Sequence, residues 1–146
     1  MLRRRCRADF DKATIDEDIA ALQQAGAAGT LALVHGGEPC DGAALALSLS
    51  AFLVGAGTRA YFACTDGWQV AQGWSRKQRP AEYDRPLGPP LGAATRTVHS
   101  GTVRYERRFE SGTRVTLELE EGAVGAGVGC IFWAGGQVTG SGCPDA

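Results

Sequence analysis

Residues 30–64 read TLALVHGGEPCDGAALALSLSAFLVGAGTRAYFAC, a pattern of strand, helix and strand. Residues 30–34 and 60–64 are short apolar runs, and the uninterrupted run 30–34 is typical of a strand buried on both faces. Between them, Asp41 is a suitable cap for a helix that ends near residue 54. Two strands joined through one helix pair in parallel, so we expect their carboxyl ends at one edge of the sheet. Such an edge is where α/β proteins place their functional residues.

A second helix is expected immediately before this unit. Thr14 and Glu17 have the spacing of a capping box, in which each side chain bonds one free amide at a helix start. Ile15 and Ile19 recur at helical spacing. The pattern therefore predicts a helix over residues 15–25.

Beyond residue 92 the apolar period changes to two, which indicates antiparallel strands. Residues 103–109 and 115–119 alternate between inward and outward positions around the turn Ser111-Gly112, which predicts a hairpin. Further strands are expected at residues 129–133 and 137–139. The outward positions are mainly Arg and Glu, whose cross-strand pairs are worth roughly a few tenths of a kcal/mol each. We therefore expect a solvated face here rather than a ligand site.

The composition is that of an ordinary globular protein with one domain or two very small ones. The 146 residues are 44% hydrophobic and 21% charged, with a net charge of −1, so the balance favours neither nucleic acid nor an anionic membrane as a partner. The longest apolar stretch, residues 43–57, is shorter than the roughly 20 residues that cross a bilayer. Acidic residues follow the arginine-rich amino terminus, so no signal peptide is recognisable in this chain and its localisation stays open.

The cysteines are scattered and suggest neither zinc nor a redox motif, because no C-x-x-C pair occurs among them. They are Cys6, Cys40, Cys64, Cys130 and Cys143. Cys64 and Cys130 lie inside apolar, strand-like runs, where we expect buried and unreactive thiols. The disulfide state and the redox compartment stay open.

The candidate site is a set of polar and aromatic residues expected near the carboxyl ends of the two parallel strands. These candidate substrate-binding residues are His35, Glu38, Asp66, Trp68 and Trp74. An indole covers the apolar face of a pyranose while carboxylates accept hydrogen bonds from hydroxyls, and two acids about 5 to 10 Å apart can do glycosidic acid–base chemistry. The alternative is that the indoles anchor an irregular loop to the core and that both acids are solvated turn residues. We expect neither acid to be catalytic.

Other chemistry has weaker support. His35-Gly36-Gly37 after a strand is similar to the oxyanion loop of esterases, but the accompanying G-x-S-x-G elbow is absent. A small α/β esterase therefore stays an unfavoured alternative that requires a reactive serine. Gly55-Ala56-Gly57 follows a helix, whereas dinucleotide binding requires glycines between a strand and a helix. We expect no cofactor and no metal.

Three segments together resemble a known family. They are AFLVGAGTRAYF at residues 51–62, EYDRPLGPPLG at 82–92 and YERRFESGTRV at 105–115. The chain resembles the carboxyl-terminal part of glycoside hydrolase-like proteins with a (β/α)₈ barrel, over about residues 15–133. In such proteins the last barrel strand leads through a proline-rich segment to a small β domain.

The resemblance implies a fold class of α/β plus β, with the last two βα units of a TIM-type barrel followed by a small antiparallel β-sheet or sandwich domain. The implied divisions are a partial barrel segment at 1–66, an ordered crossing loop rich in Trp and Pro at 67–92, and the β domain at 93–146. Six barrel strands would be missing from this chain, and the resemblance implies a secreted parent protein. Either the loop and the β domain cover the two open strands, or the natural protein is longer, which we favour.

The functional expectation follows from this resemblance and from the candidate residues. The chain is expected to contribute to a carbohydrate-binding rim and to be inactive alone as an enzyme. The other reading is a non-enzymatic carbohydrate-binding or interaction module, in which the β unit from about residue 95 to 139 binds a ligand independently.

Overall fold

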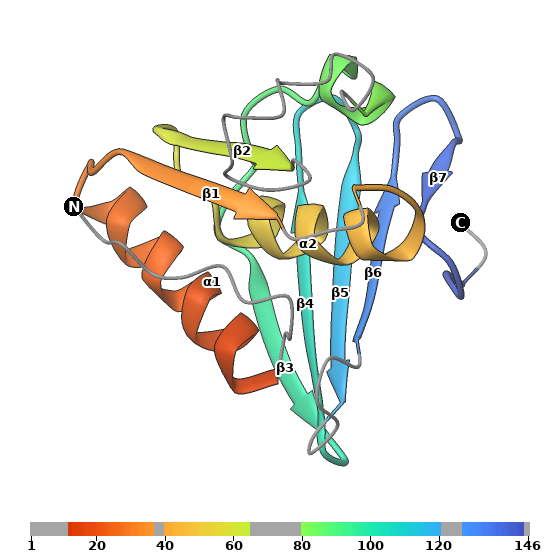
Figure 1. Ribbon diagram of the computed structural model, residues 1–146, viewed down its shortest axis with the longest axis horizontal. Helices are drawn as coiled ribbons and strands as arrows, with labels where there is room; N and C mark the ends of the chain where they lie inside the picture. Colours follow the sequence, from red (N-terminus) through yellow and green to blue (C-terminus); the bar gives the residue numbers. More distant parts are fainter. Residues whose placement is uncertain (1–11, 37–39, 65–79, 121–126, 145–146) are drawn as a thin grey trace, which may run out of the picture.

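The computed structural model describes residues 12–36, 40–64, 80–120 and 127–144, which form two helices, one short 3₁₀ helix and two β-sheets (Figure 1). The larger sheet has five antiparallel strands in sequence order, β3-β4-β5-β6-β7. Their bounds are β3 (Thr95–His99), β4 (Thr102–Arg108), β5 (Arg114–Glu120), β6 (Gly127–Phe132) and β7 (Val138–Thr139). The predicted hairpin is confirmed as β4 and β5, and the two further strands as β6 and β7.

The smaller sheet is the parallel pair β1 (Ala32–Gly36) and β2 (Ala60–Cys64), joined through α2 (Gly42–Gly55). Helix α2 contacts β4, β5 and β6 of the large sheet and both strands of the small one, so it is a layer shared by the two sheets (Figure 1). Helix α1 (Lys12–Ala27) packs beside α2. The α2 side chains are therefore buried nearly all round the helix, and one hydrophobic core includes residues of both sheets and both helices.

Close packing between α2 and β6 depends on a glycine. A Cβ on Gly129 would lie 2.5 Å from the carbonyl oxygen of Ala46 and 2.8 Å from the Cα of Leu47. It would also lie 2.8 Å from the hydroxyl of Ser50, which is fully buried in the same interface. Small side chains on both elements thus set the distance between the helix and the sheet.

Arg107 explains why a charged residue occupies an inward position of β4. Its Nη1 donates hydrogen bonds to the carbonyl oxygens of Leu53 at 3.0 Å and Ala56 at 2.6 Å, and its Nε donates to the carbonyl oxygen of Gly92 at 3.1 Å. The guanidinium thereby satisfies carbonyls at the end of α2, which lack partners within the helix. Burial lowers the pKa of Arg107 from its usual value.

The expected barrel is wrong, and with it the resemblance to a barrel glycoside hydrolase. In a barrel, the surface of α2 would pack on a continuous parallel sheet. Here the parallel sheet has two strands, and most of the buried α2 surface lies against antiparallel strands β5 and β6. The protein is a small α+β fold, not two βα units of a barrel.

Two local expectations also need correction. Helix α1 begins at Lys12, so Thr14 lies inside the helix and is not its cap. Strand β1 begins two residues later than expected because the preceding residues complete the end of α1: the Thr30 amide donates to the Ala25 carbonyl at 2.9 Å, and Gly29 has φ of 65°. A glycine in the left-handed conformation is a common helix terminator.

Candidate functional site

The carboxyl ends of β1 and β2 lie at one edge, as the sequence predicts. The parallel register pairs His35 with Ala63 and Gly36 with Cys64. Gly36 is needed for packing, because a Cβ there would lie 2.8 Å from the Phe62 ring and 3.2 Å from the hydroxyl of Ser48. This contact accounts for the glycine without an oxyanion role.

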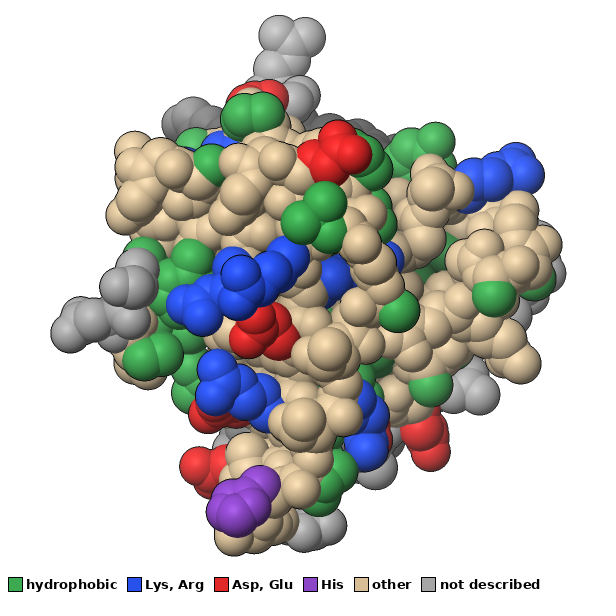
Figure 2. All heavy atoms as spheres, turned by 180° about the vertical axis from the view of Figure 1, so that it is seen from behind, with side chains coloured by type: hydrophobic (Ala, Val, Ile, Leu, Met, Phe, Trp, Pro, Cys, Tyr) green, Lys and Arg blue, Asp and Glu red, His purple; other side chains and the backbone are tan. Residues whose placement is uncertain are grey.

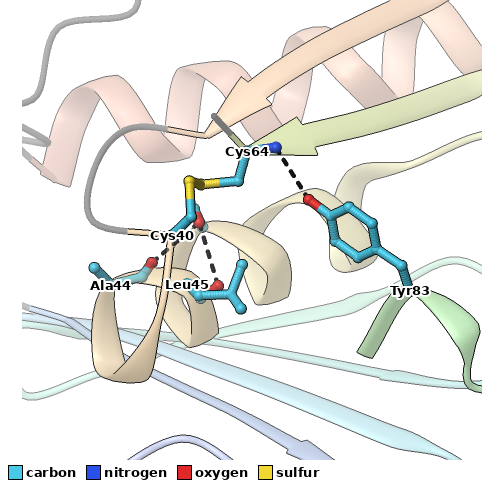
Figure 3. Close-up of a disulfide and its surroundings, with 6 residues drawn as sticks. Cys40, Ala44, Leu45, Cys64 and Tyr83 are labelled. Atoms are coloured by element: carbon cyan, nitrogen blue, oxygen red, sulfur yellow. Dashed lines mark hydrogen bonds between the residues drawn. A yellow bond between two sulfur atoms is a disulfide. The ribbon is translucent and has the colours of Figure 1, made fainter. Parts of the chain in front are cut away.

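A disulfide between Cys40 and Cys64 joins the start of α2 to the end of β2, with a Cα–Cα distance of 5.6 Å (Figure 3). A second disulfide joins Cys130 of β6 to Cys143. The prediction that Cys64 and Cys130 are unreactive buried thiols is therefore wrong. Both residues are buried as expected, but each has a partner from a polar segment whose position the sequence pattern does not reveal.

The short helix η3 (Ala81–Asp84) anchors the same edge through Tyr83 (Figure 3). The Cys64 amide donates a hydrogen bond to the Tyr83 hydroxyl at 3.0 Å, and the Tyr83 ring stands edge-on to Phe62 with centroids 6.1 Å apart. Phe62 also contacts Phe52 of α2, with centroids 5.3 Å apart. Burial, with a smaller contribution from the charge of Glu82, raises the pKa of Tyr83. The edge is thus held by ring packing and a hydrogen bond as well as by the disulfide.

Of the predicted site residues, His35 is described and lies half-buried at the carboxyl end of β1. Burial lowers the pKa of His35, which favours the neutral imidazole at pH 7. The other four lie outside the described residues: Glu38, Asp66, Trp68 and Trp74. The described residues next to these segments, Gly36, Cys40 and Cys64, do lie at one edge.

The outer face of the β1–β2 sheet is an apolar surface that the sequence reasoning missed. We define this outer face by Leu33, His35, Tyr61 and Ala63, which share it through strand alternation, together with the exposed Leu31 directly before β1. Leu33 and Tyr61 are register partners and are 76% and 60% exposed. The opposite face packs on α2, so only one face of these apolar strands is covered within the described chain.

The outer face of the five-stranded sheet is charged along β4 and the end of β5, as predicted, but Thr116, Cys130 and Phe132 on the same face are buried. Arg and Asp or Glu side chains alternate across it (Figure 2). Arg104 contacts Glu118 across the strands at 3.5 Å, Arg108 contacts Glu106 at 3.1 Å, and Arg114 lies over the ring of Phe132 at 4.4 Å. These contacts pair four of the charged side chains on this face with one another and pack a fifth on an aromatic ring.

Among the residues that the structure describes, no three His, Cys, Asp or Glu side chains are grouped so as to hold a metal ion. Within the described ranges, neither helix combines the length and apolarity needed to traverse a bilayer. No protein-family model matches the chain, and no curated protein matches it.

Proposed function

We propose that this chain is a non-enzymatic carbohydrate-binding module, with its ligand on the outer face of the β1–β2 sheet and the adjoining carboxyl edge. The observation that carries the proposal is the exposed pair Tyr61 and Leu33, which lie side by side in the register of the two strands. Leu31, directly before β1, is also an exposed apolar residue.

The chemistry of this face suits a sugar. An exposed aromatic ring beside aliphatic side chains offers contact to the C–H face of a pyranose, and the phenol hydroxyl adds a hydrogen-bonding group. The outer face contains no charged side chain at neutral pH. A neutral ligand that covers this face therefore does not remove water from any charged group of the protein. His35 is the polar residue at the carboxyl end of the same face.

The four site residues outside the described ranges stay predictions within this proposal. They are Glu38, Asp66, Trp68 and Trp74. The carboxyl edge of the β1–β2 sheet, next to these residues in the sequence, is rigid. A disulfide, a strand pairing and the Tyr83 hydrogen bond all involve Cys64 at this edge. A rigid edge is the scaffold on which binding residues hold their geometry.

The disulfides bear on where such a module works. Both bonds involve a cysteine that is almost fully buried in a strand. Disulfides of this kind persist in oxidising environments, such as extracellular space or the lumen of the secretory pathway. Glycans are abundant binding partners in these compartments, so the proposed ligand and the proposed compartment agree.

The test is binding of the intact chain to a panel of soluble polysaccharides and immobilised glycans, followed by calorimetry on any that bind. We expect Tyr61→Ala to weaken binding by about tenfold, the loss of one stacked ring with its contact area. Trp68→Ala and Trp74→Ala should also weaken it. Leu91→Ala changes an exposed apolar residue outside both sheets and is the matched control.

Two outcomes would overturn the proposal. One is that no glycan binds the wild-type chain, or that binding survives Tyr61→Ala, Trp68→Ala and Trp74→Ala unchanged. The other is a stable dimer in sedimentation that Leu33→Asp converts to monomer, because the outer face would then be covered by a second copy of the chain.

A further inference from the structure

We propose that the Cys40–Cys64 disulfide is a thiol–disulfide exchange site, at which an external dithiol reduces the bond through a mixed disulfide on Cys40. This inference concerns the chemistry of the bond and does not depend on carbohydrate binding. It rests on three features of the structure: unequal access to the two sulfurs, the position of Cys40 beside α2, and contacts that keep the edge intact without the bond.

Access to the two sulfurs is unequal. Cys40 is half-buried, whereas Cys64 is 3% exposed and belongs to the hydrophobic core. Because Cys40 is the more exposed of the two residues, we expect an incoming thiolate to attack its sulfur. Exchange depends on which sulfur is accessible to attack, so the mixed disulfide should form on Cys40.

The reaction balances with a dithiol as the reductant. The first donor thiolate bonds to Sγ of Cys40 while the Cys40–Cys64 bond breaks, and the Cys64 sulfur leaves as a thiolate that takes up one proton. The second donor thiolate then forms the donor disulfide and displaces the Cys40 sulfur, which takes up the other proton. Two electrons and two protons pass from the donor to the protein.

The position of Cys40 favours the second step. Cys40 directly precedes Asp41, the amino-terminal cap residue of the 14-residue helix α2, and the Asp41 side chain makes no capping hydrogen bond. The free amides at a helix start carry partial positive charge and stabilise a thiolate beside them. The neighbouring Asp41 carboxylate opposes this effect, but it is exposed and screened by solvent.

The edge has contacts that survive reduction. Gly36 pairs with Cys64 in the parallel ladder, the Cys64 amide donates to Tyr83, and Phe62 packs between Phe52 and Tyr83. Helix α2 stays packed on the five-stranded sheet through contacts that do not involve either cysteine. Both thiols would therefore remain near each other and able to form the bond again.

The chain contains its own control in Cys130–Cys143. Cys130 lies in β6 and is almost fully buried, and Cys143, in the segment after β7, is half-buried like Cys40, so access does not distinguish the two bonds. No helix begins beside either residue in the described chain. Without a helix start to stabilise a thiolate, this bond should be the more resistant of the two.

The experiment is a titration of the folded chain with dithiothreitol, in a Cys6→Ser background that prevents scrambling with the fifth cysteine. Free thiols are trapped with an alkylating reagent and located by peptide mass analysis, while circular dichroism follows the fold. We expect half-reduction of Cys40–Cys64 at a dithiothreitol concentration at least about tenfold below that for Cys130–Cys143, with an unchanged spectrum. Cys64→Ser incubated with oxidised glutathione should take up glutathione on Cys40.

The proposal is overturned if Cys130–Cys143 is reduced at the same or a lower concentration, or if Cys40–Cys64 opens only together with loss of the spectrum. The titration decides this on the Cys6→Ser chain even if Cys64→Ser does not fold. Failure here would leave glycan binding by the oxidised protein unaffected, so it is distinguishable from failure of the proposed function.

Discussion

Asp16 of α1 and Arg96 of β3 form a two-pronged ion pair. Arg96 Nη2 lies 2.9 Å from Asp16 Oδ2, and Arg96 Nε donates to Asp16 Oδ1 at 3.3 Å. The Tyr105 hydroxyl joins the pair, since it donates a hydrogen bond to Asp16 and accepts one from Arg96 at 3.1 Å. Burial, followed by the hydrogen bond to Asp16, raises the pKa of Tyr105 to about 12. This cluster ties the first helix to the edge strand of the large sheet.

The Tyr105 cluster predicts a loss of stability in alkali. An unfolded tyrosine releases its proton near pH 10, and the folded one near 12, so the folded state holds the proton more tightly. Its contribution is complete below pH 10 and is lost as the pH rises towards 12. We expect a decrease of about 1–2 kcal/mol in the free energy of unfolding over this range, after allowance for solvent screening of the partly exposed ion pair.

Denaturant titrations at several pH values test this for the wild type and for Tyr105→Phe. The variant should be less stable at neutral pH and should show a smaller alkaline decrease. Tyr61→Phe, which changes an exposed phenol, is the control and should follow the wild-type profile. An alkaline decrease of the same size in Tyr105→Phe would show that other groups cause it.

Ser50→Ala should stabilise the protein. The Ser50 hydroxyl is fully buried, and the structure gives it no hydrogen-bond partner among the described residues. Removal of an unsatisfied buried polar group should raise the free energy of unfolding by about 1 kcal/mol. Ser48→Ala is the matched control, because Ser48 lies in the same helix but donates to the Ala44 carbonyl at 3.0 Å. Equal effects of the two substitutions would point to helix propensity instead.

Gly129→Ala should destabilise the interface between α2 and β6. The added methyl would overlap the Ala46 carbonyl at 2.5 Å, and backbone atoms on both sides must separate to admit it. We expect a loss of about 3 kcal/mol, typical of an overpacked core, and a lower melting temperature. Gly135→Ala is the control, since its Cβ would meet nothing within 4 Å. Equal stability of the two variants would contradict the close approach.

His35 predicts a stability change in acid. Because burial lowers the pKa of His35, the unfolded chain takes up this proton at a higher pH than the folded chain. The free energy of unfolding therefore decreases as the pH falls below the ordinary pKa of 6.5. Above this pH, His35 is neutral in both states and causes no loss of stability. The decrease in the free energy of unfolding between pH 7 and pH 5 should be smaller in His35→Gln than in the wild type. His99→Gln, on the exposed strand β3, should leave the decrease unchanged.

Strict alternation made the large sheet predictable. Val103, Tyr105 and Phe109 are buried as their period of two requires, and the register with β5 follows from the turn between the strands. Arg107 has the same parity but is held at the end of α2 by backbone carbonyls that no strand pattern can reveal. The sequence pattern does not predict strand β3, because its five residues lie at an exposed edge of the sheet and bury neither face.

The small sheet shows why its surroundings were harder to predict. Both strands are apolar on both faces, a pattern that indicates double burial but does not state which element covers each face. In the structure α2 covers one face, and Leu33 and Tyr61 are exposed on the other. The barrel prediction assumed that barrel strands absent from this chain completed the packing around these two strands. The parallel order of β1, α2 and β2 was nonetheless correct, because two neighbouring strands joined through one helix pair in parallel through a crossover connection.

Of the candidate site residues, only the position of His35 can be compared with the prediction. His35 lies at the expected edge because parallel strands have their carboxyl ends at the same edge of a sheet. The cysteine pairing was not predictable, since five cysteines allow several pairings and spacing does not distinguish them. The role of Tyr83 was also not predictable, because it contacts Cys64 from a segment nineteen residues further along the chain and no local sequence pattern indicates this contact.

The layer shared by the two sheets also affects how the chain is made. Synthesis from the amino terminus produces α2 before β5 and β6, the strands against which most of its buried side chains pack. Until those strands leave the ribosome, the nascent chain carries an apolar helix without its main cover. Exposed apolar segments of incomplete chains are the species that aggregate and that chaperones bind. Helix α2 is thus a segment of the nascent chain that chaperones should bind, and the yield of folded protein should improve when chaperones are abundant.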